Sequence, residues 1–136
     1  MAPDGKKAVW MADDDADDCM LASEAFAEIN SDAAFLCVED GVELLENLAE
    51  RSESRGLPDL ILLDLNMPRK DGRKALLEIK SEPVLRHIPI VILTTSKEQK
   101  DISFTMAAGA VSFITKPDTF DEWVAIMKSL VESWLS

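Results

Sequence analysis

The stretch LLDLNMPRKDG, residues 62–72, decides the fold of this chain. It contains the end of an unbroken apolar run, LILL at 60–63, which stops at the carboxylate of Asp64. Apolar runs without alternation are typical of strands that are covered on both faces, as in a parallel sheet. Residues that favour turns come next: Asn66, Pro68, Asp71 and Gly72. The stretch therefore predicts a buried strand that presents an acid at its carboxyl end.

Strand-like and helical patterns alternate along nearly the whole chain. Apolar runs predict five strands, at 8–12, 33–38, 59–64, 88–95 and 110–115. Apolar residues three and four positions apart predict the helices that follow them, at 16–29, 42–49, 73–80, 97–108 and 120–134. Such alternation produces βαβ units, with a parallel sheet between two layers of helices. We predict an α/β fold, a five-stranded doubly wound parallel sheet with five helices, in a single domain over residues 1–136.

Composition narrows the classes of partner and the compartment. The 136 residues carry 26 acidic and 14 basic side chains, a formal net charge of −12. Such a chain repels nucleic acid and anionic lipid, so we expect neither as a direct partner. No apolar run approaches the roughly 20 residues of a membrane span, and residues 1–7 lack the apolar part of a signal peptide. We expect a cytoplasmic protein, in which Cys19 and Cys37 are free thiols.

Four of the predicted strands end in polar side chains. The first ends at Asp13 and Asp14, the third at Asp64, the fourth at Thr94 and the fifth at Lys116. In open α/β sheets the carboxyl ends of the strands share one edge, and ligands bind there. The sequence thus predicts that three carboxylates, a hydroxyl and an amine gather at one edge of the sheet.

Three clustered carboxylates need compensating positive charge. At an effective dielectric constant near 20, two unit charges about 4 Å apart repel by about 4 kcal/mol. A Mg²⁺ ion suits a few carboxylates plus a phosphate, and Lys116 adds a second positive charge. A carboxylate can also attack phosphorus and form an aspartyl phosphate, a transfer that needs alignment and charge neutralisation. Asp64, in the middle of the group, is the candidate acceptor.

Each of these signals has a simpler structural explanation when taken alone. A single acid at a strand end is usually a turn or cap residue, and the acids at 13–15 could cap the following helix. Lys116-Pro117 could be an ordinary loop. Their joint occurrence at the ends of buried strands favours a functional site.

The chain resembles the receiver domain of two-component response regulators, the CheY-like family. Four elements carry the resemblance in order: DD at 13–14, DLNMPRKDG at 64–72, TT at 94–95 and KP at 116–117. The resemblance covers about residues 8–134 and implies a flavodoxin-like (βα)5 fold. It also implies a stand-alone, single-domain response regulator.

The resemblance implies a role for each residue that matches the family's motifs. Asp64 matches the phosphoacceptor, and the Mg²⁺ ligands are expected to be Asp13, Asp14, Asp64 and the backbone carbonyl of Asn66. Thr94 and Lys116 match the groups that bind the phosphoryl oxygens. Thr94 with Phe113 matches the switch pair, and the Lys116–Pro117 peptide bond is expected to be cis. Asp118 departs from the family's common pattern, in which an apolar residue follows Lys-Pro.

The same resemblance implies partners. A sensor histidine kinase or a histidine phosphotransfer protein would donate the phosphoryl group to Asp64. The FITKP and FDEW stretches and the loops at 51–58 and 82–89 look like those of receivers that partner phytochrome-type kinases. Output would then be a contact with a downstream protein. Apolar residues on the switching face could also form a homodimer: Phe104, Met106, Trp123, Ile126 and Trp134.

Two other function classes compete with the phosphorylated switch. A Mg²⁺-dependent phosphohydrolase also works through an aspartyl phosphate, but such enzymes usually place a second acid two residues later, where this chain has Asn66. A scaffold would bind partners without phosphorylation and would not need the full set of acid, hydroxyl and lysine. We therefore expect a signalling switch and not an enzyme.

Overall fold

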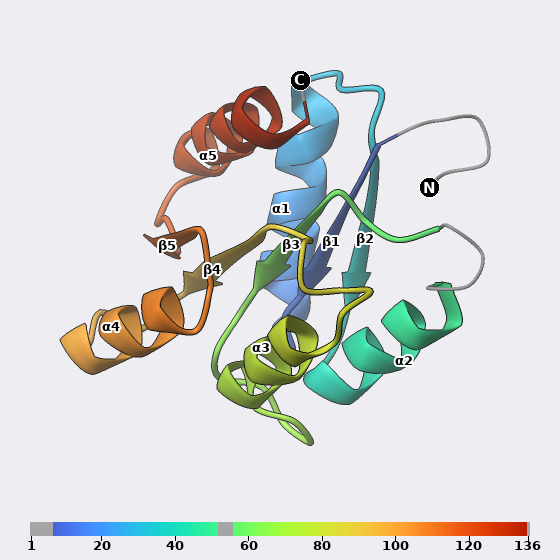
Figure 1. Ribbon diagram of the computed structural model, residues 1–136. Coiled ribbons are helices and arrows are strands. Elements are labelled where there is room, and N and C mark those ends of the chain that lie inside the picture. Colours follow the sequence, from blue (N-terminus) through green and yellow to red (C-terminus); the bar gives the residue numbers. More distant parts are fainter. Residues whose placement is uncertain (1–6, 52–55, 136) are drawn as a thin grey trace.

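The computed structural model describes residues 7–51 and 56–135 (Figure 1). The strands are β1 Ala8–Ala12, β2 Ala34–Val38, β3 Leu60–Leu63, β4 Ile90–Thr94 and β5 Ser112–Thr115. The helices are α1 Ala16–Glu28, α2 Gly41–Arg51, α3 Gly72–Ser81, α4 Gln99–Ala107 and α5 Phe120–Trp134. All ten expected elements are present, with ends that differ by a few residues. Residues 52–55, part of the expected loop at 51–58, lie outside the described residues.

One parallel sheet with the strand order β2-β1-β3-β4-β5 forms the centre of the fold. Helices α1 and α5 pack together on one face, and α2 and α3 lie on the other (Figure 1). The predicted doubly wound α/β fold is confirmed. From β1 the chain adds β2 on one side of the sheet and then β3, β4 and β5 on the other. The carboxyl ends of β1 and β3 flank this change of direction, which is where such folds bind ligands.

The side chains of β3 explain why its sequence does not alternate. All four residues of β3 are buried, two facing each helical layer: Ile61 and Leu63 on one side, Leu60 and Leu62 on the other. Full burial of a strand on both faces requires apolar residues at every position. The strand ends at Leu63, and the next residue is Asp64, whose side chain is also buried.

The turn after β3 brings α3 close to the strand end. Gly72, the first residue of α3, donates its N–H to the Leu65 carbonyl at 3.0 Å. A Cβ at Gly72 would collide with the backbone oxygen of Asp64, so only glycine allows this approach. Asp71 caps α3 by accepting a hydrogen bond from the Arg73 N–H at 2.7 Å.

The structure corrects three expectations. Cys19 of α1 and Cys37 of β2 form a disulfide, so the expectation of free thiols is wrong. The described residues contain no cis peptide bond, so the bond before Pro117 is trans, the form that X–Pro bonds favour by about 0.5–1 kcal/mol. Trp123 is buried against β1, β3 and β4 and offers no surface, because α5 turns this side of the helix toward the sheet.

The remaining surface expectations are met in part. Phe104, Met106 and Trp134 are exposed, whereas Ile126 is half-buried.

Gly109 has a φ of 113°, the left-handed conformation that ends α4. Within residues 7–51 and 56–135, no helix combines the length and apolar character needed to cross a lipid bilayer.

Candidate phosphoacceptor and metal site

Three carboxylates meet at the carboxyl ends of β1 and β3. One oxygen from each of Asp13, Asp14 and Asp64 lies within 4.8 Å of the others. Asp13 and Asp64 are almost fully buried, with 1% and 5% of their surfaces exposed, and Asp14 is exposed. The third acid of the run, Asp15, caps α1 by accepting hydrogen bonds from the N–H groups of Asp17 and Asp18. The run at 13–15 therefore both caps the helix and supplies the cluster.

Lys116 lies in the same cluster and contacts three acids. Its Nζ is 2.7 Å from Asp13 Oδ2, 3.2 Å from Asp64 Oδ2 and 2.7 Å from Asp18 Oδ2. The side chain is only 7% exposed, so these charges interact with little screening by water. Asp13, Asp64 and Lys116 lie together as the sequence predicts, whereas the contact with Asp18 was not predicted. Its position could have indicated the contact, because Asp18 lies in the first turn of α1, the helix that begins just after Asp13 and Asp14.

Burial and charge shift the pKa values of this cluster in opposite directions. Burial raises the pKa of Asp13 to about 6, although Lys116 and the Asp15 N–H oppose the shift. Burial alone would lower the pKa of Lys116, but its contacts with Asp13 and Asp18 outweigh that effect and raise it. Lys116 therefore stays protonated at neutral pH, and a further positive charge beside Asp13 would favour the ionised form of its carboxyl group.

The donor set fits a divalent cation. Asp13 Oδ2 is buried without a hydrogen bond partner, since Lys116 approaches it as an ion pair outside hydrogen-bond geometry. Asp14 adds an exposed carboxylate, so a bound ion would keep contact with water. Oxygen ligands with access to water are what hard divalent cations such as Mg²⁺ prefer.

We expect Mg²⁺ to stabilise the protein more at pH 7.5 than at pH 5. The folded pKa of Asp13 is raised from 3.8 to about 6, so the folded state holds this proton more tightly than the unfolded state. Stability therefore falls as pH rises from about 4 to 6, by roughly 3 kcal/mol for the whole shift. A cation beside Asp13 offsets this loss above pH 6. Thermal unfolding with MgCl₂ and with EDTA at both pH values measures the effect.

Asp13→Asn serves as the control for this pH dependence. It removes the titrating group, so the Mg²⁺-induced shift in unfolding temperature should become smaller and lose its dependence on pH. An equal shift at pH 5 and pH 7.5 in the unmodified protein would contradict the assignment of Asp13 as the group that the cation relieves.

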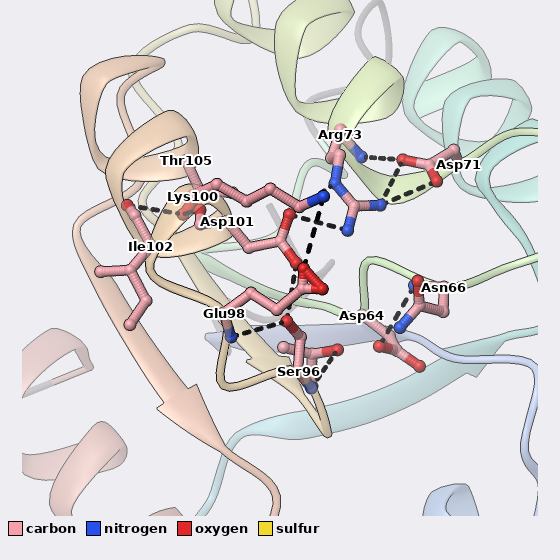
Figure 2. Close-up of polar contacts among 11 residues, drawn as sticks. Asp64, Asn66, Asp71, Arg73, Ser96, Glu98, Lys100, Asp101, Ile102 and Thr105 are labelled. Atoms are coloured by element: carbon pink, nitrogen blue, oxygen red, sulfur yellow. Dashed lines mark hydrogen bonds and ion pairs between the residues drawn. The ribbon is translucent and has the colours of Figure 1, made fainter.

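The neighbouring strand end carries a polar network that joins three elements (Figure 2). Thr94, buried at the end of β4, accepts a weak hydrogen bond from the Ser96 N–H at 3.5 Å. The Ser96 hydroxyl donates to Asp101 of α4 at 2.6 Å, and Arg73 of α3 donates to the same carboxylate at 2.9 Å. The hydrogen bond from Ser96, reinforced by Arg73, holds the pKa of Asp101 below its ordinary value despite burial.

This network ties the loop after β4 to both α3 and α4. Arg73 also contacts Asp71 at 2.9 Å, so one guanidinium bridges the cap of α3 and the first turn of α4 (Figure 2). Asp101 is 4% exposed, so its ion pair with Arg73 is buried and costly to break. This ion pair therefore constrains the position of α4 relative to α3. The position of Thr94 and the position of α4 are therefore linked through Ser96.

Three predicted residues lie at the edges of the cluster. Asn66 is exposed, and its N–H points at Asp64 Oδ1 from 3.4 Å, so the chain passes directly beside this carboxylate (Figure 2). Phe113 of β5 is half-buried against the core cluster that includes Ile92, its partner in the sheet. Pro117 is half-buried beside Lys116.

Comparison with known proteins identifies the family. Residues 9–128 match the response regulator receiver domain, and the chain belongs to that family. It is a phosphoacceptor response regulator of two-component signalling, the class of signalling protein that partners a histidine kinase.

Particular relatives extend over almost the full chain. Response regulator Rcp1 of Synechocystis is 31% identical over 131 residues, which cover 95% of this chain and 89% of Rcp1. The structure resembles the phosphorylated cyanobacterial phytochrome response regulator RcpA, with a TM-score of 0.87, 38% identity and coverage of 97% and 96%. It also resembles the Mn²⁺-bound form of Rcp1, with a TM-score of 0.84, 31% identity and coverage of 96% and 95%.

Proposed function

We propose that Asp64 accepts a phosphoryl group from the phosphohistidine of a sensor kinase or a phosphotransfer protein. The observation that carries this proposal is the placement of Asp64, buried at the end of β3 with Lys116 Nζ 3.2 Å from Oδ2 and two further acids within 4.8 Å. One Asp64 oxygen attacks phosphorus while the bond from phosphorus to the histidine nitrogen breaks. The imidazole leaves as a neutral group. The negative charge therefore stays on the phosphoryl oxygens, at this edge of the sheet.

The surrounding residues would neutralise and orient the phosphoryl group. Asp13, Asp14, Asp64 and the Asn66 carbonyl would hold a Mg²⁺ ion, which would supply positive charge to the phosphoryl oxygens. Lys116 would exchange its contact with Asp64 for a phosphoryl oxygen, and the Thr94 hydroxyl would donate to another. Lys116 is held beside Asp64 before transfer, and this placement lowers the ordering cost of reaching the transition state.

The switch would run from Thr94 to the surface of α4. When Thr94 turns toward the phosphoryl group, Ser96 and Asp101 follow through the contacts described above, and Phe113 moves into the space that Thr94 leaves. The face formed by α4, β5 and α5 would then change and contact a downstream protein. Phe104 and Met106 of α4, both at least 40% exposed, are apolar groups on that helix that a partner or a second copy could cover.

The relatives support a divalent metal and a phytochrome-type kinase. Rcp1 is known in a Mn²⁺-bound form and RcpA in a phosphorylated form as a phytochrome response regulator. By analogy, we propose that this chain is a receiver that needs Mg²⁺ and is phosphorylated by a phytochrome-type kinase. Residues 8–134 would act as a single receiver domain in the cytoplasm, where the phosphorylated kinase would reach it.

The experiment that tests the function is phosphorylation by a small donor. The purified protein is incubated with acetyl phosphate and MgCl₂, and the intact mass is followed by mass spectrometry over time. We expect one added phosphoryl group per chain, no adduct when EDTA replaces Mg²⁺, and slow loss of the adduct after the donor is removed.

Other outcomes identify the competing classes. Rapid turnover of many phosphoesters without a lasting adduct would indicate a phosphohydrolase. Absence of an adduct with acetyl phosphate and with a phosphorylated kinase would indicate a scaffold, and the proposal would be wrong. Mn²⁺ in place of Mg²⁺ should also support the reaction, since the donor set consists of oxygens only.

A further inference from the structure

Cys19 and Cys37 lie on two elements that border the acidic cluster. Cys19 is in the first half of α1 and Cys37 is in β2, one of the two edge strands of the sheet. Their Cα atoms are 6.2 Å apart, within the range that a disulfide spans. Eighteen positions separate them in sequence, so the bond closes a loop that contains most of α1.

The disulfide sits directly beside the candidate metal ligands. The Cys19 Sγ lies 3.5 Å from the Asp13 carbonyl oxygen, and Cys37 pairs in the sheet with Met11, two residues before Asp13. Cys19 also follows Asp18, the acid that contacts Lys116. A bond between α1 and β2 at this point restrains the segment from Asp13 to Asp18, which carries these acids.

The two sulfur-bearing residues are accessible to small reagents. Both are half-buried, and both line a cavity of about 190 Å³ that opens beside the acids. The other residues of this cavity are Asp13, Asp14, Ala16, Val38 and Glu39. Disulfides of cytosolic proteins are usually transient and respond to the redox state, because the thiol pool there reduces accessible ones.

We propose that Cys19 and Cys37 form a reversible thiol–disulfide site whose closed state holds the acidic segment in place for a divalent cation. The thiol chemistry stands on the geometry of the two cysteines alone. Its effect on metal binding rests on the proposed function, because that function makes Asp13 and Asp14 ligands. Preorganisation of ligands raises affinity by lowering the ordering cost of binding.

The reaction balances as two successive exchanges. One cysteine, as a thiolate, attacks a low-molecular-weight disulfide, forms a mixed disulfide and releases one small thiol. The second cysteine attacks the mixed disulfide, closes the Cys19–Cys37 bond and releases the second small thiol. The protein loses two electrons and two protons, and the small disulfide gains both; excess thiol drives the reverse reaction.

Charge selects the co-reactant. Three carboxylates line the cavity, from Asp13, Asp14 and Glu39, and the whole chain has a formal net charge of −12. Anionic disulfides such as oxidised glutathione are repelled, whereas a cationic disulfide such as cystamine is attracted. We expect cystamine to close the bond about tenfold faster than oxidised glutathione at low salt, with the difference shrinking as salt screens the charges.

The first test follows the thiols and does not depend on phosphorylation. The reduced protein is incubated with cystamine or oxidised glutathione, alkylated and weighed. We expect two alkylated thiols before oxidation, none after it, and full reversal with dithiothreitol under native conditions. Cys37→Ser should stop at a mixed disulfide on Cys19. A protein whose thiols stay alkylatable at every ratio of disulfide to thiol, or whose bond opens only on unfolding, would overturn the proposal.

The second test measures Mg²⁺ affinity by calorimetry for the oxidised and reduced forms. We expect the oxidised form to bind about threefold tighter, and Cys37→Ser to bind like the reduced form under both conditions. The oxidised form should also unfold on the order of 10 °C higher. Equal affinity in the two forms would overturn the coupling. Failure of both forms to bind Mg²⁺ would instead contradict the proposed function, while the exchange of thiols would still be measured by mass.

Discussion

Asp64→Asn is expected to abolish phosphorylation by acetyl phosphate and by a phosphorylated kinase, while the protein remains folded. The amide is close in size and shape to the carboxylate, so the packing at the end of β3 is kept. An amide is a poor nucleophile toward phosphorus and cannot form the acyl phosphate. The initial rate of adduct formation, read as intact mass, should therefore fall by a factor of about 1,000 or below detection. Circular dichroism provides the check on folding.

Asp118→Asn is the matched control for this substitution. Asp118 is exposed two residues after Lys116, so its loss changes the charge near the same edge without touching Asp64. This variant should be phosphorylated at close to the normal rate. An adduct of normal yield on Asp64→Asn, mapped by peptide mass to another acid, would show that a different residue accepts the phosphoryl group.

The part of the site that could be predicted from sequence lies where local patterns meet one topological rule. The uniform apolar run before Asp64 marks a strand buried on both faces, and the same signal precedes Asp13. Parallel strands bring their carboxyl ends to one edge, so the acids and Lys116 had to meet there once the alternation was recognised. The resemblance to receivers then assigned the roles.

The contacts that sequence could not supply depend on side chains far apart in the chain. Lys116 and Asp18 are 98 residues apart, and Arg73 and Asp101 are 28 apart, with no periodic pattern that joins either pair. The disulfide was missed for a different reason. The expected cytoplasmic location favours free thiols, and only the packing of α1 against β2 shows that the two cysteines lie together.

Lys116→Met is expected to destabilise the metal-free protein and to slow phosphorylation. Methionine keeps most of the side-chain volume but removes the ammonium that contacts Asp13, Asp18 and Asp64. Removing one partner of a buried ionic group typically costs about 3–5 kcal/mol, because the remaining charges lose their compensation. In EDTA at pH 7.5, chemical denaturation should show a loss of that size.

Mg²⁺ distinguishes the loss of charge from a simple packing defect. The ion would supply positive charge to Asp13 and Asp64, so saturating MgCl₂ should recover much of the stability of Lys116→Met, whereas a packing defect would remain. Lys97→Met is the control, since Lys97 is exposed nearby and should show neither effect.

Phosphorylation of Lys116→Met should stay slow even when Mg²⁺ has restored the fold. The phosphoryl group would still lack the ammonium that neutralises one of its oxygens, a contact expected to contribute about 100-fold to the rate. A variant with restored stability and slow phosphorylation would therefore separate the two roles of this lysine. If the rate returned together with the stability, Lys116 would serve only to hold the acids, and the metal alone would carry the transfer.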